Sequence, residues 1–438
     1  MKGQTRRNFL RNSMTASAAA IAAAGAASSA QSLPQSATDS PGGSSSHASE
    51  NAIPQTAATS IADLLDHALH VKAGQKVLLV AYLDGLYGGD NVVDRDAIHW
   101  IAQALEARGA IPEVLWVDAV ARVNAWEFPD AVREAMDRND RTILHSFDLV
   151  VEEILAFRKY LYAYQKTPTS PGNHITAVRN MATTGPLLTT EWAQTPYELV
   201  SEIRHQAGKR IQAQIGAKWE LSDPLGTRLS GVILPPASGF RSYDARREER
   251  THTPWPEWVV PPIHLSETSG TFVFDRTLSW WSRYIGISPY FEKPVQLVIR
   301  ENKILSIEGG TEADALRSFM KDLEGRTGGG VYDFDMMHFG VHPQAHVAEH
   351  QCPSILYRRL IEHCHTSNFH AHVGSPRATE SYPYWPHITG DMRHPTFRIG
   401  DALLHDNGRL TVLDDPVIKA VAARYPGRPG LEREPYHG

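Results

Sequence analysis

The segments KVLLVAY (Lys76–Tyr82), DAIHWIAQALEARG (Asp96–Gly109) and IPEVLWVDA (Ile111–Ala119) follow one another in the N-terminal half of the chain. The first is a continuous apolar run, which is typical of a strand buried in a parallel sheet. We expect the second to form a helix and the third a second strand, so that together they predict a βαβ unit. The loop before the helix, LDGLYGGD, has neither the GxGxxG spacing nor a Walker pattern, and it therefore indicates no nucleotide site.

The N-terminal residues have the features of an export signal. Residues 1–30 contain TRRNFL (Thr5–Leu10), which matches the twin-arginine pattern, and an Ala/Gly-rich run that ends at an expected cleavage point after Ala30. Residues 31–56 are rich in Ser, Pro, Gly and Gln and predict a disordered linker, after which Ser60 is expected to cap the first helix. The pattern predicts a periplasmic or secreted protein carried by the twin-arginine translocase. A chance arginine pair before an Ala-rich helix is the alternative.

The overall composition is that of a soluble globular protein, with 438 residues of which 42% are hydrophobic and 21% charged. A net charge of −6, without a run of Lys or Arg after the first eleven residues, gives no basic face for nucleic acid. No segment predicts a membrane anchor. The only cysteines, Cys352 and Cys364, exclude a disulfide scaffold and a Cys-rich zinc site, and whether they pair stays open.

The length allows two domains, and a Pro-, Trp- and Arg-rich segment at residues 235–262 is expected to separate them. We predict an α/β N-terminal domain (57–250) that contains the βαβ unit, and an α+β metal-binding catalytic domain (251–438). The other expected elements are helices at 129–165, 192–214 and 312–323 (the last capped by Thr311), strands at 178–184 and 270–276, and hairpins at 218–234, 294–310 and 396–413.

Histidines crowd the C-terminal part of the chain: 11 of the 21 lie between His338 and His405. Neutral imidazole is the commonest protein ligand for a transition metal, whereas histidine is a mediocre core residue. The stretch from HFGVH (His338–His342) to YWPH (ending at His387) therefore predicts a metal centre. A solvated His-rich surface loop and adventitious metal binding are the alternatives.

Several motifs in fixed order resemble a known group of enzymes. VKAGQKVLLVA, ALEARGAIPEVLWVD, WELSDPLGTRLSGVI, GTFVFD, VIRENKILSIEGGTEADAL, HFGVHP, FHAHVG and HITGDMRHPT, between Ala62 and Leu413, are similar to the aminopeptidase T superfamily. That superfamily includes 2,5-dihydroxypyridine 5,6-dioxygenase and 5-nitroanthranilic acid aminohydrolase. The resemblance implies an aminopeptidase T-like fold, a metal-dependent enzyme and a homodimer.

The resemblance also implies a ligand set. The two metal-bridging glutamates of the aminopeptidases fall on Thr271 and His338, and the aspartate of their HxD pair falls on Thr389. Two close cations need such carboxylates to offset their repulsion, so we expect a single divalent metal. Its implied ligands are His338, His370 and His387, with Asp391 as a candidate fourth. Mn²⁺ or Fe²⁺ suits such a set better than Zn²⁺.

Around these ligands we expect the groups that work on a substrate. His372 lies two residues from His370, on the same side of a strand, where it can move protons or only support the ligand loop; Asp391 is a second proton carrier. Arg377 and Arg393 are candidate clamps for a carboxylate, and Tyr382, Tyr384 and Trp385 can enclose a planar ring. His342, His346 and His350 are interpreted as surface residues or as residues that support the ligands.

The first functional hypothesis is a mononuclear metal hydrolase that removes an amine from a small aromatic acid, as in 5-nitroanthranilic acid aminohydrolase. The second is a non-haem Fe(II) dioxygenase that opens a dihydroxylated ring. A metal aminopeptidase is disfavoured by the missing glutamates. A periplasmic metal-binding protein without turnover is the hypothesis from another class.

Overall fold

The computed structural model divides into two compact units, Met1–Ala52 and Ile53–Gly438, and the helices and strands of the described residues belong to the second. The structure describes residues 52–82, 93–117, 130–145, 176–236, 242–244, 252–256, 259–277, 282, 285–377, 379 and 388–431. The predicted signal peptide and most of the predicted linker lie outside these ranges, as does the loop at 83–90. Among the described residues, no helix combines the length and the apolar character needed to cross a bilayer.

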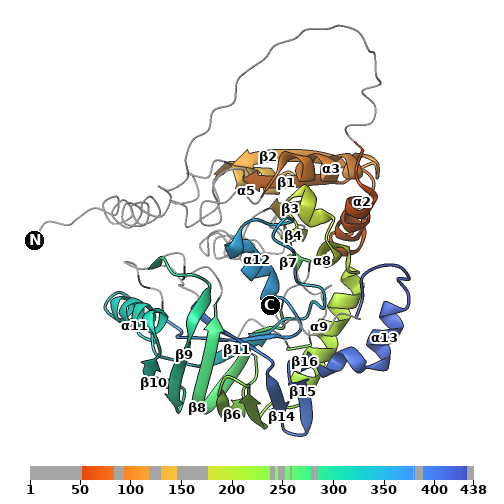
Figure 1. Cartoon of the computed structure of the whole chain (residues 1–438). Coiled ribbons are helices and arrows are strands. Elements are labelled where there is room, and N and C mark those ends of the chain that lie inside the picture. Colours follow the sequence, from red (N-terminus) through yellow and green to blue (C-terminus); the bar gives the residue numbers. More distant parts are fainter. Residues whose placement is uncertain are drawn as a thin grey trace, which may run out of the picture. The chain divides into compact units, whose positions relative to one another are not determined.

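A five-stranded sheet with the strand order β2-β1-β3-β4-β7 forms one layer of the protein, and all its neighbours pair in parallel (Figure 1). The strands are β1 (Lys76–Tyr82), β2 (Ile111–Val117), β3 (Arg141–His145), β4 (Thr176–Asn180) and β7 (His252–Trp255). Helix α3 (Arg95–Glu106) joins β1 to β2 and buries Ile98, Ile101 and Leu105 along one face. The predicted βαβ unit is therefore confirmed.

Two expectations for this half of the chain were wrong. The expected helix at 129–165 is interrupted within its described part: α5 (Asp130–Asp137) is followed by β3, whose apolar residues are buried beside β1. A short apolar run fits a buried strand as well as a helix, and the pairing with β1 decides between them. The first helix, α2 (Gln55–Ala62), begins after Pro54, and it continues as the π-helix η1 (Asp63–Ala68); Ser60 lies inside α2 and is not its cap.

The second layer is an antiparallel sheet of eleven strands. Its members are β5 (Lys218–Ser222), β6 (Arg228–Ile233), β8 (Ile263–Arg276), β9 (Tyr290–Arg300), β10 (Lys303–Glu308), β11 (Met336–Phe339), β12 (Asn368–His372), β13 (Thr389–Arg393), β14 (Thr396–Ile399), β15 (Ala402–Asp406) and β16 (Arg409–Leu410). The long strand β8 pairs with both β11 and β13, and these two flank β12. Strands β8, β11, β12 and β13 thus form a closed ring of pairings, in which β12 has a neighbour on each side.

The predicted hairpins are confirmed. Strands β5 and β6 turn at Asp223–Gly226, where the Asp223 carboxylate accepts a hydrogen bond from the Gly226 backbone N–H at 2.9 Å. Between β9 and β10, Glu301 and Asn302 both have positive φ (47° and 62°), as a two-residue hairpin turn requires. One detail was wrong: Thr311 is the first residue of α11 (Thr311–Glu324), and the cap position belongs to Gly310.

The sheets do not divide at residue 250. Strands β5 and β6 precede the predicted boundary but belong to the antiparallel sheet, whereas β7 follows it and pairs with β4 in the parallel sheet. The alternating burial of β5 fits a sheet with one buried face, and the Pro- and Trp-rich segment supplies an edge strand. The chain therefore crosses between the two sheets more than once.

Helices pack around the sheets. They are α7 (Gly185–Leu188), α8 (Glu191–Gln194), α9 (Tyr197–Gln212), α12 (Ile355–Glu362), η5 (Thr411–Asp414) and α13 (Pro416–Ala422). In helix α12, Tyr357, Leu360 and Ile361 pack into the core of the parallel sheet (Figure 1). The Tyr357 hydroxyl donates to the backbone carbonyl of Met181, just after β4. These contacts fix the position of α12 against the parallel layer.

Candidate metal centre

Three histidines on two neighbouring strands lie together. His338 of β11 is the register partner of His370 of β12, and His372 is two residues further along β12. Because side chains alternate across a strand, His370 and His372 point to the same face. The rings of His338 and His370 are stacked with centroids 4.8 Å apart, and those of His338 and His372 lie 5.0 Å apart. One nitrogen from each of the three lies within 4.8 Å of the others.

These imidazoles are buried and suited to coordination. The exposed fractions of His338, His370 and His372 are 8%, 1% and 2%. The Nδ1–H of His338 donates to the Val260 carbonyl oxygen at 3.1 Å, a tautomer in which Nε2 carries the lone pair that a metal needs. Burial is the main cause that holds the pKa of His372 well below 6.5, and the neighbouring His338 is the second. The His372 ring is therefore neutral at physiological pH. Neutral imidazole is the form that binds a metal.

A second set of groups shares His370. His363, at the C-terminal end of α12, and Asp391 of β13 also place one ligand atom each within 4.8 Å of His370 and of one another. The rings of His363 and His370 have centroids only 3.7 Å apart, and Asp391 is the register partner of His370. Two imidazoles and a carboxylate are a ligand combination known for non-haem iron.

Asp391 is tied firmly into this second set. Its Oδ2 accepts hydrogen bonds from His363 Nδ1 at 2.8 Å and from Asn368 Nδ2 at 3.1 Å, and it also pairs with Arg359. Burial raises the pKa of the Asp391 carboxyl, but the Arg359 charge and the His363 contact outweigh burial and lower it to about 2. The carboxylate is therefore ionised. Its other oxygen, Oδ1, is buried and makes no hydrogen bond to any described residue.

The predicted site residues have different outcomes. The structure brings His338 and His370 together, with Asp391 beside His370. It places His372 among the ligand nitrogens, whereas the sequence predicts a proton carrier or a support at that position. The predicted ligand His387 and the predicted ring-enclosing residues Tyr382, Tyr384 and Trp385 lie outside the described residues.

The two predicted arginine clamps are engaged elsewhere. Exposed Arg377 donates from Nε to the Gly328 carbonyl at 3.2 Å, and Arg393 pairs with Asp275. The surface interpretation of His342 was wrong, because that residue is fully buried and its Nδ1 accepts a hydrogen bond from the Gln344 backbone N–H. The two cysteines, Cys352 and Cys364, are buried thiols that form no disulfide with one another.

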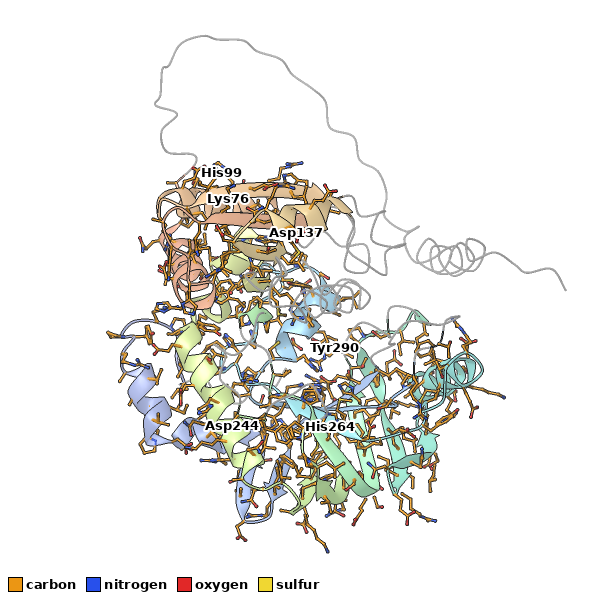
Figure 2. The ribbon with its side chains drawn as sticks, turned by 180° about the vertical axis from the view of Figure 1, so that it is seen from behind. Lys76, His99, Asp137, Asp244, His264 and Tyr290 are labelled. Atoms are coloured by element: carbon orange, nitrogen blue, oxygen red, sulfur yellow. The ribbon has the colours of Figure 1, made fainter. Side chains whose placement is uncertain are left out.

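Three residues of the site were not predicted: His363, Arg359 and His264. His363 stands in the sequence HCH, and Arg359 precedes it by four residues, so that both lie on one face of α12. That spacing is visible in the sequence, but the charge pairing with Asp391 across the fold is not. His264 of β8, labelled in Figure 2, lies near enough to His372 to affect its charge, and its Nε2 makes no hydrogen bond to a described residue.

The residues present fit a single divalent transition metal. Zinc lies about 2.0–2.1 Å from a ring nitrogen, so two nitrogens on one tetrahedral ion are roughly 3.4 Å apart. The three nitrogens lie within 4.8 Å of one another, so rotation of the side chains can bring them to that separation. The three imidazoles and the Asp391 Oδ1 supply donors of the right chemical kind.

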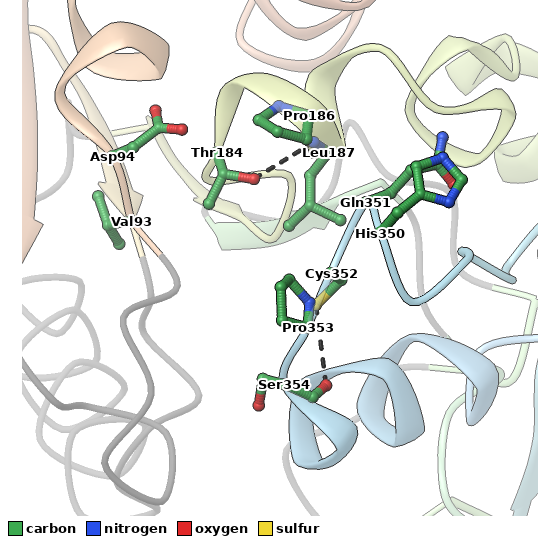
Figure 3. Close-up of a pocket in the computed structure, with 10 residues that line it drawn as sticks. All are labelled: Val93, Asp94, Thr184, Pro186, Leu187, His350, Gln351, Cys352, Pro353 and Ser354. Atoms are coloured by element: carbon green, nitrogen blue, oxygen red, sulfur yellow. Dashed lines mark hydrogen bonds between the residues drawn. The ribbon is translucent and has the colours of Figure 1, made fainter. Parts of the chain in front are cut away.

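A separate pocket of about 410 Å³ lies beside the parallel sheet (Figure 3). Its walls include Asp94, which caps α3, Thr184, which caps α7, and Ser354, which caps α12. His350 and Cys352 complete one side, but neither belongs to a candidate metal set in the described part of the chain. The pocket is therefore distinct from the histidine cluster.

Comparison with known proteins supports the fold. No protein-family profile matches the sequence, and no curated protein does so. A solved structure of 2,5-dihydroxypyridine dioxygenase from Pseudomonas putida KT2440 is similar over 81% of this chain and 96% of its own, with 14% identity and a TM-score of 0.52. Wild-type AmpT from Thermus thermophilus is similar over 81% and 99%, with 12% identity and a TM-score of 0.46. The chain therefore shares the fold of 2,5-dihydroxypyridine dioxygenase.

Proposed function

We propose that this protein is an enzyme that holds one divalent transition metal at His338, His370 and His372 and hydrolyses an amine from a small aromatic acid. The observation that carries the proposal is the buried cluster of these three imidazoles, whose ligand atoms converge within 4.8 Å. His387 and Asp391 remain candidate further ligands, and Mn²⁺ or Fe²⁺ remain the preferred metals.

The charge of the ligand set supports hydrolysis. As ligands, three neutral imidazoles leave the charge of a divalent ion undiminished, and Arg359 already offsets the charge of the nearby Asp391 carboxylate. A metal bound in such a set supplies Lewis acidity, which lowers the pKa of water toward neutrality. The protein residues around it then have to orient the substrate and move its protons.

His363 has the arrangement expected of a proton carrier. Its Nδ1–H donates to Asp391 Oδ2 at 2.8 Å, which fixes the ring orientation and leaves Nε2 able to accept a proton. Asn368 donates both to that carboxylate, at 3.1 Å, and to the His363 carbonyl oxygen, at 3.3 Å. In this arrangement Asp391 positions His363, and His363 takes the proton from the attacking water and returns it to the leaving amine.

The test is turnover without oxygen. Purified protein, loaded with Mn²⁺ or Fe²⁺ under anaerobic conditions, is incubated with amino-, nitroamino- and hydroxybenzoates, and ammonia release is measured. We expect one equivalent of ammonia per substrate consumed, with matching loss of activity in His370→Ala. Absence of ammonia from every aminobenzoate, with a stoichiometric metal, would refute the hydrolase proposal.

Ring cleavage by a non-haem Fe(II) dioxygenase is the second candidate. Two observations favour it: the shared fold with 2,5-dihydroxypyridine dioxygenase, and the second set with two histidines and one carboxylate (His363, His370 and Asp391). Such an enzyme should consume one O₂ per dihydroxylated ring and stop under argon, so the same assay separates the two reactions. Release of an N-terminal residue from a peptide would instead indicate an aminopeptidase. Metal binding without any turnover would indicate a metal-binding protein that is not an enzyme.

Export by the twin-arginine pathway stays part of the proposal. A protein with a metal centre enclosed in its core gains from a pathway that carries folded proteins. Fusion of residues 1–56 to a reporter, compared with an Arg6→Lys and Arg7→Lys double variant, tests it. Export that is unchanged in the double variant contradicts it.

A further inference from the structure

Arg359 is a charged residue with an unusual environment. Its side chain is completely buried, and it emerges from α12 beside the metal cluster. A guanidinium carries five N–H bonds, and a buried group of this kind normally uses them all. Here Nη2 pairs with Asp391 Oδ2, whereas Nε and Nη1 make no hydrogen bond to any described residue.

The pairing with Asp391 is also incomplete from the other side. Arginine and carboxylate commonly meet through two parallel hydrogen bonds, but here one carboxylate oxygen takes all the contacts and Oδ1 takes none from a described residue. The guanidinium is therefore turned so that one nitrogen serves Asp391 while the others are left for a different acceptor. A role limited to neutralising Asp391 does not explain this orientation.

The charges around Arg359 favour an anion as that acceptor. Arg276 lies close enough for the two guanidinium charges to affect one another, and Arg393 adds a third. These three arginines are matched by three carboxylates: Asp275, Asp391 and Glu362, the last of which accepts a hydrogen bond from the Tyr290 hydroxyl at 2.5 Å (Tyr290 is labelled in Figure 2). A divalent metal held by neutral imidazoles adds positive charge that none of these groups balances. In a buried site, such an excess attracts a negatively charged ligand.

We propose that Arg359 is the specificity-determining residue of the site, and that its Nη1 N–H groups bind the carboxylate of an aromatic acid. This inference deepens the proposed function and rests on it for the position of the metal. The carboxylate replaces the acceptor that Nη1 lacks among the described residues, and the planar guanidinium suits it better than the point charge of a lysine would. Arg377 and Arg393, the clamps expected from the sequence, have partners elsewhere.

The test is a binding measurement with two ligands of nearly equal shape. Benzoate carries the charge and benzamide does not, and the dissociation constant of each is measured by calorimetry on metal-free and on Mn²⁺-loaded protein. We expect the wild-type protein to prefer benzoate by at least tenfold when it is loaded with Mn²⁺, and by a smaller factor when it is metal-free, because only the Arg359 donors then act on the carboxylate. Equal affinity for the two ligands, or no binding of benzoate, would overturn the proposal without any variant.

Two variants assign the preference to one residue. Arg359→Lys keeps a positive charge beside Asp391 but removes the planar donors, and we expect it to reduce the preference for benzoate to less than twofold. Arg210→Lys, a control at a partly buried arginine paired with Asp415 and outside the site, should keep the full preference. A folded Arg359→Lys protein that still prefers benzoate tenfold contradicts the proposal; Arg359→Gln serves as a second variant if the first does not fold.

The test of Arg359 can fail or succeed independently of the test of the proposed function. Metal content and ammonia release test the hydrolase, whereas benzoate binding to metal-free protein tests Arg359. Protein that binds no metal but selects benzoate through Arg359 refutes the metal enzyme alone. Protein that binds metal and releases ammonia, but does not distinguish benzoate from benzamide, refutes the role of Arg359 alone.

Discussion

Replacement of Asp391 by asparagine tests the electrostatic core of the site. The substitution keeps the shape of the side chain but removes the charge that faces Arg359, and both groups are completely buried. The fall of the carboxyl pKa from 3.8 to about 2 corresponds to about 2 kcal/mol of stability at neutral pH. Because the substitution also leaves the buried guanidinium unpaired, the total loss should reach the cost of removing one partner from a buried pair, typically about 3–5 kcal/mol.

We therefore expect Asp391→Asn to lower the melting temperature of metal-free protein by about 6–10 °C at pH 7, at roughly 2 °C per kcal/mol for a large domain. The pH dependence has a definite sign. Because the folded-state pKa is depressed, the stabilisation is complete above pH 3.8 and is lost as the pH falls toward 2. The difference between the wild-type protein and the variant should narrow over that window in calorimetric scans.

Asp414→Asn is the matched control, since Asp414 forms an exposed ion pair with Arg409. Exposed pairs contribute about 0–1 kcal/mol, so this variant should melt within about 2 °C of the wild-type protein. Equal melting temperatures for Asp391→Asn and the wild-type protein would refute the assignment of a buried, ionised carboxylate. A melting-temperature difference between the two proteins that stays constant from pH 7 to 2 would refute the lowered pKa of Asp391 as its cause.

Three other substitutions probe the cluster and the core around it. His370→Ala, which removes the residue shared by both ligand sets, should weaken metal affinity by more than a hundredfold in a competition titration, whereas exposed His350→Ala should leave it unchanged. Gly340→Ala should reduce the yield of folded protein and its melting temperature, because an added Cβ would overlap the His365 carbonyl oxygen; normal melting would show that the loop can move. Burial lowers the pKa of His405 to about 4, so the stability it contributes is complete above pH 6.5 and is lost as the pH falls toward 4. His405→Phe should remove part of that acid sensitivity in urea titrations, and an unchanged pH profile would contradict the assignment.

Local pattern predicts much of the fold. The apolar run of β1, the hairpin turn at Glu301–Asn302 and the alternation in β5 and β6 depend on neighbours in the sequence, and these elements appear where expected. The helix expected at 129–165 failed because β3 is defined by its pairing with β1, a contact between residues far apart in the chain. For the same reason, the predicted boundary at residue 250 does not separate the two sheets, since β7 belongs to the sheet of β4.

The site shows the same division between local and distant information. The spacing of His370 and His372 on a strand is visible in the sequence, and the resemblance aligns His338 with them, so the sequence alone points to these residues. The unusual state of Arg359 cannot be predicted in this way, because it depends on a carboxylate 32 residues away that approaches through a different strand. The pairing of Arg359 matters because the residue is buried, and burial depends on the folded molecule as a whole.

Helix α12 gives the two cores a shared boundary. Tyr357, Leu360 and Ile361 face the parallel sheet, while Arg359 and His363 at the other side of this short segment contact Asp391. Repacking among side chains far from the imidazoles could displace this helix slightly. Such a displacement would therefore move Arg359 and His363, which hold the Asp391 carboxylate. Substitutions deep in the N-terminal layer are thus expected to alter ligand affinity, and a survey confined to residues near the cluster would miss them.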